Sequence, residues 1–268
     1  MSIKLGTIGG GVMGEALLSR LIAQGLYSPE EILVSDPSLQ RRQWLSQQYG
    51  VQVGMENSLA ASAAEVLLLA IKPQSFAMVV AELEHCPGER RALVLSILAG
   101  VPLSKLEAAF PQQPVIRAMP NTPATVAAGI TAMAAGQHVQ SHHLELAKQI
   151  FQAVGEAVDV PEALMDAVTA LSGSGPGYLA VAVEALIDGG VSVGLPRAIA
   201  TQLALQTLRG TAQLLQDNEL HPAELKDRVT SPGGTTIAGI SALERAGFRS
   251  ALIEAVRAAY QRSRELGS

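Results

Sequence analysis

The first 160 residues alternate short apolar runs with segments in which apolar residues recur at helical spacing. Uninterrupted apolar runs are typical of strands in a parallel sheet that is covered on both faces. Because such runs alternate with helices, the pattern predicts an α/β fold with a doubly wound sheet of the Rossmann type. The predicted strands are Ile3–Ile8, Ile32–Val34, Val66–Ile71, Ala92–Ile97, Val115–Ala118, Gly129–Ala135 and Ala157–Val160, and the predicted helices include Val12–Gln24, Leu39–Tyr49 and Leu144–Val154.

The strand pattern stops after Pro161, and the remaining residues are rich in Ala, Leu, Val and Gly. We therefore predict two domains, a dinucleotide-binding domain over residues 1–160 and an all-helical domain over residues 161–268. Helix breaks are expected where Gly, Pro or Asn residues gather. These places are Gly173–Gly177, Gly194–Pro196, Asn218–Pro222, Ser231–Gly234 and Gly247.

One of the predicted helices has almost no polar face. Between Tyr178 and Ile187 the one charged residue is Glu184, and a helix that is apolar nearly all round must be buried on all sides. The helical half is too short to cover it, so we predict a subunit interface here. A membrane span is disfavoured, because the uncharged stretch Ala167–Val183 contains glycines and Pro176, whereas a spanning helix needs about 20 mainly apolar residues.

Composition and charge narrow the range of functions. Hydrophobic residues make up 48% of the 268 residues and charged residues 16%, which is the balance of a folded globular protein. A net charge of −5 without a basic stripe, together with 3% aromatic residues, argues against nucleic-acid binding. The N-terminus lacks a signal-peptide pattern, and the lone Cys86 excludes an internal disulfide and fits the reducing cytoplasm.

The sequence predicts neither a metal site nor a cysteine nucleophile. His138 and His142 are four residues apart, but no third ligand is evident. Cys86 precedes Pro87 and Gly88 in a turn and has no basic residue beside it that would favour the thiolate. We therefore interpret Cys86 as incidental.

A glycine-rich segment follows the first predicted strand and opens the first predicted helix. Gly9, Gly11 and Gly14 match the spacing G-x-G-x-x-G, with Val12 and Met13 between the last two glycines. In this context the first glycine allows a tight turn, the second lets the backbone approach a pyrophosphate, and the third allows the helix to pack closely on the strand. The phosphates would bind at the helix N-terminus. The alternative is a glycine-rich turn that binds no ligand.

An acidic residue ends the second predicted strand at the spacing that dinucleotide-binding proteins use. Asp36, after Ser35, lies 22 residues beyond Gly14, and a carboxylate there would bind the ribose 2′-hydroxyl of NADH and repel the 2′-phosphate of NADPH. Arg41 and Arg42 follow, however, and arginines can clamp a phosphate. A simple Asp36-Pro37 turn with a helix cap is the third interpretation. The residues leave NADH and NADPH both open.

Ligands of open α/β sheets bind beyond the carboxyl ends of the strands, so later strand ends add candidates for coenzyme contacts. Lys72 is equally well explained as a solvated strand end, and Asn121, in a loop fixed by two prolines, as part of a connecting turn. Asn57 is expected beside the adenosine half of the coenzyme. The candidates are Ser35, Asn57, Ala70, Lys72, Pro73, Ala99 and Asn121.

Two segments of the helical half have the composition of ligand-binding turns. Leu171–Tyr178 combines serines and glycines with Pro176, which suits a first helical turn. Ser231–Thr236 separates two helical patterns, so that a helix N-terminus suited to a small carboxylate is predicted after Gly234, with Thr236 one turn into that helix. Seen alone, the second segment is equally well explained as a capped turn.

Together these segments resemble the pyrroline-5-carboxylate reductase family over nearly the whole chain. The resemblance runs from Ile8–Gly14 through Lys72-Pro73, Met119–Pro123 and Leu171–Tyr178 to Gly247-Phe248-Arg249. Its most specific part is the Asp227–Glu244 region, which contains Ser231–Thr236. It implies a Rossmann domain and a helical dimerisation domain, a cytoplasmic homodimer that in many members assembles into a decamer of five dimers, and NADPH as the coenzyme with NADH as the alternative. Asp36 departs from the small or neutral residue of many NADP-preferring members, which bears on that preference.

The implied reaction is transfer of a hydride from the nicotinamide to the imine carbon of the cyclic imine 1-pyrroline-5-carboxylate, which gives L-proline in the last step of proline biosynthesis. By resemblance, Ser231, Gly233, Gly234, Thr235 and Thr236 hold the substrate. Thr236 would also act catalytically through a hydrogen bond to the ring nitrogen. Glu219 aligns with an acidic residue near that pocket and would stabilise the iminium, unless it is a solvated loop carboxylate.

Two other functions share parts of this pattern. The β-hydroxyacid dehydrogenases join the same kinds of domain, but they need a catalytic lysine soon after a glycine-rich turn in the second domain. No lysine lies between Lys148 and Lys226 here. A dinucleotide sensor without enzymatic activity would keep Gly9–Gly14 but would not need Ser231–Thr236.

Overall fold

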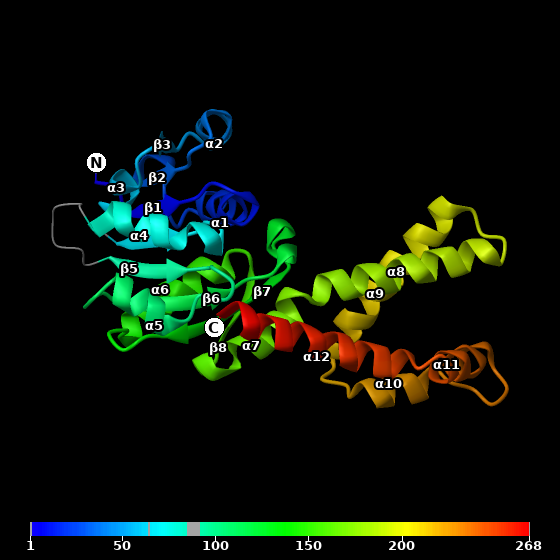
Figure 1. Ribbon diagram of the computed structural model, residues 1–268. Coiled ribbons are helices and arrows are strands. Elements are labelled where there is room, and N and C mark those ends of the chain that lie inside the picture. Colours follow the sequence, from blue (N-terminus) through cyan, green and yellow to red (C-terminus); the bar gives the residue numbers. More distant parts are fainter. Residues whose placement is uncertain (1, 64, 85–91, 268) are drawn as a thin grey trace. The chain divides into compact units, whose positions relative to one another are not determined.

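The computed structural model describes residues 2–63, 65–84 and 92–267 (Figure 1). The chain forms two compact units, one made of Met1–Ser174 with Ala259–Ser268 and the other of Gly175–Ala258. Each unit is described by itself below. Cys86, which the sequence predicts to be incidental, lies outside the described residues.

The first unit is built on one sheet with the strand order β3-β2-β1-β4-β5-β6-β7-β8. Neighbouring strands pair in parallel from β3 through β6, β7 is antiparallel to β6, and β8 is parallel to β7. The chain reverses direction across the sheet between β1 and β4, which is the switch point of a doubly wound fold. The strands are β1 Leu5–Ile8, β2 Ile32–Ser35, β3 Gln52–Gly54, β4 Val66–Leu69, β5 Leu93–Ser96, β6 Val115–Met119, β7 Gly129–Ala135 and β8 Gly155–Asp159.

Helices cover both faces of this sheet, which explains why a central strand such as β4 is apolar at every position. Along β4, Val66 and Leu68 pack into one hydrophobic cluster with α1 (Val12–Ala23), α2 (Leu39–Tyr49) and α6 (Ser141–Gln152). Leu67 and Leu69 pack into the opposite cluster, which α3 (Asn57–Ala61), α4 (Phe76–Glu84), α5 (Leu103–Ala109) and α7 (Met165–Val168) complete. The predicted Rossmann-type sheet is therefore confirmed.

Two features of the first unit differ from the sequence-based expectation. The pattern did not predict β3, because this edge strand has three residues, of which Val53 alone is a large apolar one. A helix break was predicted at the cluster Gly173–Gly177, but the chain stays helical there except at Ser174. A π-helical turn, Thr169–Gly173, leads with one intervening residue into α8, Gly175–Ser192, in which Pro176 occupies the first turn. Pro is tolerated there because that backbone N–H has no partner within the helix.

The boundary between the units lies after Ser174 and not after residue 160. Met165 and Ala170 are buried in the first unit, with 1% and 0% exposure. The end of α12 (Phe248–Gly267) also belongs to this unit, where the Ser263 hydroxyl donates a hydrogen bond of 2.7 Å to the Asp166 carboxylate. The end of the strand pattern at Pro161 thus marks a change of secondary structure, whereas packing against the sheet continues through α7 and the π-helical turn Thr169–Gly173.

The second unit is helical throughout, as predicted. It holds α8, α9 (Arg197–Asp217), α10 (Pro222–Arg228), α11 (Thr235–Arg245) and the first half of α12. The breaks fall at four of the predicted places: Gly194–Pro196, Asn218–Pro222, Ser231–Gly234 and Gly247. Within this unit α8 packs on α9, and the Tyr178 hydroxyl of α8 donates to the Ala255 carbonyl of α12 over 3.4 Å.

The helices of the second unit leave large apolar side chains uncovered. On α8, Val181 is 67% exposed and Leu186 62% exposed, and Val183 is the one buried residue of this helix. By length and composition alone, the stretch Glu162–Ser192 would suffice to cross a membrane, and 11% of its most apolar window is buried within the chain. Such a surface indicates a contact with another surface, since single chains seldom expose so many neighbouring apolar residues.

Candidate functional site

The glycine-rich segment lies at the switch point of the sheet. It follows β1, whose two neighbours are β2 and β4, and the backbone N–H groups of Gly9 and Ala70 continue the pairing by donating to the carbonyls of Ser35 and Ile8 over 2.8 Å. Gly11 is the N-terminal cap of α1, so the N–H groups of the first helical turn have no partners within the helix. This is the place in an open α/β sheet at which a pyrophosphate binds.

Each glycine of the motif has a different physical reason to be a glycine. Gly9 has a φ of +99°, and a Cβ on it would lie 2.6 Å from the Ala70 carbonyl oxygen. A Cβ on Gly14 would lie 2.7 Å from the Gly9 carbonyl oxygen. Gly11 has an ordinary extended backbone, and a Cβ on it would meet no atom within 4 Å. The chain's own packing therefore explains Gly9 and Gly14, whereas at Gly11 the space is open as a bound diphosphate would require.

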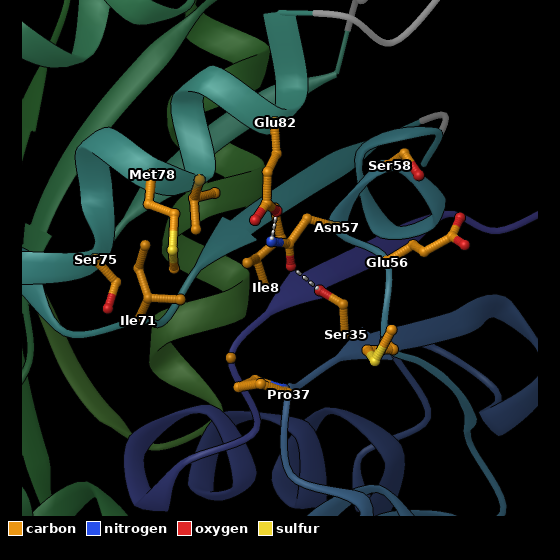
Figure 2. Close-up of a pocket in the computed structure, with 13 residues that line it drawn as sticks. Ile8, Ser35, Pro37, Glu56, Asn57, Ser58, Ile71, Ser75, Met78 and Glu82 are labelled. Atoms are coloured by element: carbon orange, nitrogen blue, oxygen red, sulfur yellow. Dashed lines mark hydrogen bonds between the residues drawn. The ribbon is translucent and has the colours of Figure 1, made fainter.

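A cavity of about 480 Å³ adjoins this loop between the ends of β1, β2 and β4 (Figure 2). Gly9, Ser35 and Asn57, three of the predicted coenzyme contacts, line it together. Ile71 and Met78 give the cavity an apolar side, and its size suits the adenosine half of a dinucleotide. The full lining is Ile8, Gly9, Ser35, Pro37, Met55, Glu56, Asn57, Ser58, Ile71, Ser75, Met78, Val79 and Glu82.

Asn57 is held in place at the cavity wall by two hydrogen bonds (Figure 2). Its amide oxygen accepts from the Ser35 hydroxyl over 2.8 Å, and its amide nitrogen donates to the Glu82 carboxylate over 2.5 Å. Sequence reasoning placed Asn57 beside the adenosine but missed Glu82, because nothing in the sequence pairs a residue of α4 with the start of α3. A fixed amide beside an apolar wall can orient a planar base.

The Asp36 carboxylate accepts hydrogen bonds from the glycine loop and from the turn after β2. One oxygen of its carboxylate accepts from the Gly10 N–H and the other from the Ser38 N–H, each over 2.9 Å. The predicted turn is thus present, although the cap of α2 is Ser38, whose hydroxyl accepts from the Arg41 N–H over 3.3 Å. Each carboxylate oxygen has a second acceptor position, so these bonds leave Asp36 able to accept a ribose hydroxyl.

Arg41 and Arg42, the candidate phosphate clamps, both contact acceptors of the chain. Arg42 donates to the carbonyls of Asp36 and Pro37 over 2.6 and 3.1 Å. Arg41 donates to the Gly10 carbonyl and to the Glu15 carboxylate. Glu15 also accepts from the Trp44 indole over 3.2 Å and from the Tyr49 hydroxyl over 2.8 Å. Burial raises the pKa of Glu15, but hydrogen bonds from Arg41, Tyr49 and Trp44 outweigh it and hold that pKa below its ordinary value.

The remaining predicted coenzyme contacts are scattered over the first unit. Ala70 touches the glycine loop, because its backbone and Cβ face Gly9 and Gly14. Lys72 is exposed and caps the short turn that begins at Pro73, and Ala99 is exposed in the turn after β5. Val12 is 71% exposed and Met13 half-buried at the start of α1. These positions are compatible with coenzyme binding, and their roles remain predictions.

Asn121 has a clear structural task. Its amide oxygen accepts from the Ile130 N–H over 3.0 Å, and its amide nitrogen donates to the Ser172 carbonyl over 3.2 Å. It therefore ties the end of β6 to β7 and to the π-helical turn. The connecting-turn interpretation accounts for its side chain, and contact with the nicotinamide remains a prediction.

The predicted substrate-binding turn lies in the second unit and has the expected form. The Gly234 N–H donates to the Ser231 carbonyl over 3.0 Å, with Pro232 and Gly233 between them and a φ of +68° at Gly233. This is the residue pattern of a type II β-turn. Gly234 caps α11, so Thr235 and Thr236 are its first two residues. Thr236 therefore lies in the first turn of α11, not one turn into the helix, and it is exposed.

Glu219 lies in the turn between α9 and α10. It has a φ of +50°, which is uncommon for a residue other than glycine, and its side chain is exposed. Helix α10, about 10 Å long at 1.5 Å per residue, separates it in the chain from the turn at Ser231. The catalytic role that the resemblance implies for Glu219 has no contact in this unit to support it and remains a prediction.

No group of three His, Cys, Asp or Glu side chains suited to a metal ion occurs in the part of the chain that the structure describes. A glycine loop at a switch point, the adjoining cavity and a separate helical unit define the class of the protein. It is a dinucleotide-binding protein of the Rossmann type with a helical second domain.

Comparison with known proteins narrows this class to one family. Residues 162–266 match the family profile described as pyrroline-5-carboxylate reductase dimerisation, and residues 4–100 match the profile described as NADP oxidoreductase, coenzyme F420-dependent. The pyrroline-5-carboxylate reductase of Synechocystis is 61% identical over 267 residues, which cover 100% of this chain and 99% of the relative.

Solved structures of the same family share the fold of the whole chain. A pyrroline-5-carboxylate reductase from Coxiella burnetii has a TM-score of 0.91 at 36% identity and covers 100% of both chains. The Plasmodium falciparum pyrroline carboxylate reductase, solved with NADP bound, has a TM-score of 0.89 at 30% identity, with 99% of this chain and 98% of that one covered. The chain belongs to the pyrroline-5-carboxylate reductase family, and the family and fold predicted from the sequence are confirmed.

Proposed function

We propose that this protein reduces 1-pyrroline-5-carboxylate to L-proline with NADPH as the hydride donor. Membership of the family over the full length of the chain carries the proposal most strongly. The glycine loop, with its open space at Gly11 and its adjoining cavity, supplies the coenzyme site that this reaction needs. The test is oxidation of NADPH by the purified protein that depends on pyrroline-5-carboxylate. A dinucleotide sensor would bind the coenzyme and show no such turnover.

The reaction needs little acid–base catalysis by the protein. NADPH supplies a hydride, and a protonated imine nitrogen makes the carbon of the substrate's C=N bond electrophilic. The chain binds the diphosphate at the start of α1, orients the adenosine through Asn57, and holds the substrate carboxylate with the free N–H groups at the start of α11. The Thr236 hydroxyl hydrogen-bonds the ring nitrogen in this proposal.

NADPH is the coenzyme that we propose first, and NADH is the alternative. The NADP profile over residues 4–100 and the NADP bound to the Plasmodium relative support NADPH. Asp36 favours NADH, because its carboxylate accepts a ribose hydroxyl and repels a phosphate. Direct measurement of both dissociation constants decides between the two coenzymes.

We further propose that the protein works as a homodimer in the cytoplasm and does not insert into a membrane. The chain carries the dimerisation domain of its family, and the exposed apolar residues of α8 supply the surface that a partner subunit would cover. The stretch Glu162–Ser192 fits an interface better than a membrane, because it carries Glu184 and Asp188 and its first half packs into the Rossmann unit. Assembly of five dimers into a decamer is a further proposal that sedimentation can test.

Thr236 offers a graded test of the proposed substrate site. Thr236→Ala removes a hydrogen bond to a charged iminium, which costs on the order of 1.5–3 kcal/mol, so we expect turnover to fall about tenfold to a hundredfold. Thr236→Ser keeps the hydroxyl and should lose much less. Because Thr236 is exposed in the chain, neither change should alter the melting temperature much or weaken coenzyme binding.

Thr236→Val is the discriminating control. Valine keeps the shape of threonine and lacks the hydroxyl, so the proposal expects it to be as slow as Thr236→Ala. Were Thr236 a packing residue, Thr236→Val would be mild and Thr236→Ser the worse change. A Thr236→Val enzyme with the turnover of the unmodified protein would remove the hydroxyl from the mechanism.

A further inference from the structure

A cluster of side chains joins the start of α1 to α2, directly behind the glycine loop. Glu15 is at its centre and accepts hydrogen bonds from Arg41, Trp44 and Tyr49. About a quarter of each of the Glu15 and Arg41 side chains is exposed, so the pair is shielded but reachable from solvent. The function proposed above does not use Glu15.

Arg41 and Asp36 hold the same residue from two sides. Asp36 accepts from the Gly10 N–H over 2.9 Å, and Arg41 donates from its Nε to the Gly10 carbonyl. The guanidinium and the carboxylate that marks the expected position of the ribose 2′-hydroxyl are thus both bonded to the backbone of Gly10. A phosphate on that hydroxyl would find Arg41 to be a nearby cation of suitable geometry.

The Arg41 guanidinium already donates a hydrogen bond to the Glu15 carboxylate. A guanidinium that donates to a carboxylate makes a charge-assisted bond, roughly twice as strong as a neutral one, so a 2′-phosphate must compete with Glu15 for Arg41. Asp36 adds a second negative charge on the same side. NADH carries no 2′-phosphate and gains nothing from the release of Arg41.

We propose that Glu15 shifts the coenzyme preference of this protein away from NADPH and toward NADH, because it competes with the 2′-phosphate of NADPH for Arg41. This inference rests on the proposed function, since it concerns the coenzyme site of that reaction. Glu15 is thus a specificity-determining residue that acts through Arg41. Glu15→Gln removes the competing charge and leaves Arg41 free to meet the phosphate.

The test compares dissociation constants of NADPH and NADH, measured by titration calorimetry without substrate. In Glu15→Gln we expect the ratio of the NADH constant to the NADPH constant to rise about tenfold, the effect of one charge-assisted bond. Any general effect of the lost charge on the shared diphosphate cancels in this ratio. Glu30→Gln makes the same charge change before β2, at the end of the strand opposite Asp36, and should leave the ratio unchanged.

A double-mutant cycle shows whether the effect passes through Arg41. Arg41→Ala alone should weaken the binding of both coenzymes, because it also removes the bond to Gly10. Adding Glu15→Gln to Arg41→Ala should no longer change the ratio of the NADH to the NADPH dissociation constant. Arg42→Ala is the matched control, in which Glu15→Gln keeps its effect. An equal change in both constants for Glu15→Gln, or a shift that persists without Arg41, would overturn the proposal.

The single tryptophan gives a second readout in the unmodified protein, since Trp44 donates to Glu15. We expect adenosine 2′,5′-bisphosphate to change Trp44 fluorescence more than 5′-AMP does, because only the former draws Arg41 from Glu15. Identical changes would contradict the competition. If neither coenzyme binds, the coenzyme site itself is wrong and the inference with it. If both bind but no proline forms, the reaction is wrong, and the coenzyme ratio still decides the inference.

Discussion

Gly11→Val should abolish coenzyme binding and leave the fold almost untouched. The two added methyl groups would stand where the diphosphate must approach the backbone. Within the chain a Cβ at this position has no neighbour within 4 Å, and the backbone φ of −68° suits valine. Valine is a poor helix cap, so we expect a cost of up to about 1 kcal/mol in unfolding free energy. Coenzyme titration and thermal melts measure the two effects separately.

Gly14→Val is the matched contrast within the same motif. Its Cβ would lie 2.7 Å from the Gly9 carbonyl oxygen, which is backbone and cannot move away cheaply. We expect a lower melting temperature, with about 1–3 kcal/mol lost to overpacking, alongside any loss of binding. Normal coenzyme titration in Gly11→Val would show that the diphosphate does not bind at this loop.

Leu186→Glu should convert the dimer into folded monomers. Leu186 is 62% exposed on α8, and its burial by a partner would contribute about 2 kcal/mol in each subunit. A two-fold interface loses this contribution twice, about 4 kcal/mol, so the dimer dissociation constant should rise about a thousandfold. Light scattering in dilute solution measures the mass, and circular dichroism checks that the helices remain.

Val183→Glu, on the same helix, should behave differently. Val183 belongs to the helix that the sequence predicts to form the interface, but it is 9% exposed and lines the groove between α8 and α9, so a charge there breaks packing within the subunit. We expect it to unfold or aggregate, with several kcal/mol lost. Gln152→Glu on α6 adds the same charge to an exposed position of the first unit and should stay dimeric. A monomeric unmodified protein would contradict the interface.

The parts of the fold that the sequence predicted are those in which one chain segment determines its own environment. Val66–Leu69 reads as a strand buried on both faces because every residue is apolar, and Gly233 reads as a turn because Pro232 precedes it. The three-residue edge strand Gln52–Gly54 was not predicted, since an edge strand with one large apolar residue has no such pattern. The division between the two compact units after Ser174 was not predicted either, because Ser263 and Asp166 meet only after folding.

The candidate site divides in the same way. Gly9, Ser35 and Asn57 were predicted to contact the coenzyme, and they line one cavity because they lie at or just after the ends of neighbouring strands, at the same edge of the sheet. Met78 and Glu82 were missed, because residues of α4 have no local mark of a binding site. Asp36 shows the limit most clearly. Its position was predicted, whereas its bonds to Gly10 and Ser38 and the neighbouring Glu15–Arg41 pair depend on how α1 and α2 approach each other.

The central claim is that this chain transfers a hydride from a nicotinamide coenzyme to the imine carbon of a cyclic imine, the carbon that becomes C5 of proline. The most direct measurement uses NADPH deuterated at C4 of the nicotinamide, with pyrroline-5-carboxylate and the purified protein, and analyses the product by mass spectrometry. We predict L-proline that carries one deuterium at C5, and no such product from Gly11→Val. Coenzyme that binds without forming proline, or proline without deuterium at C5 when the transferred position is fully labelled, would contradict the account.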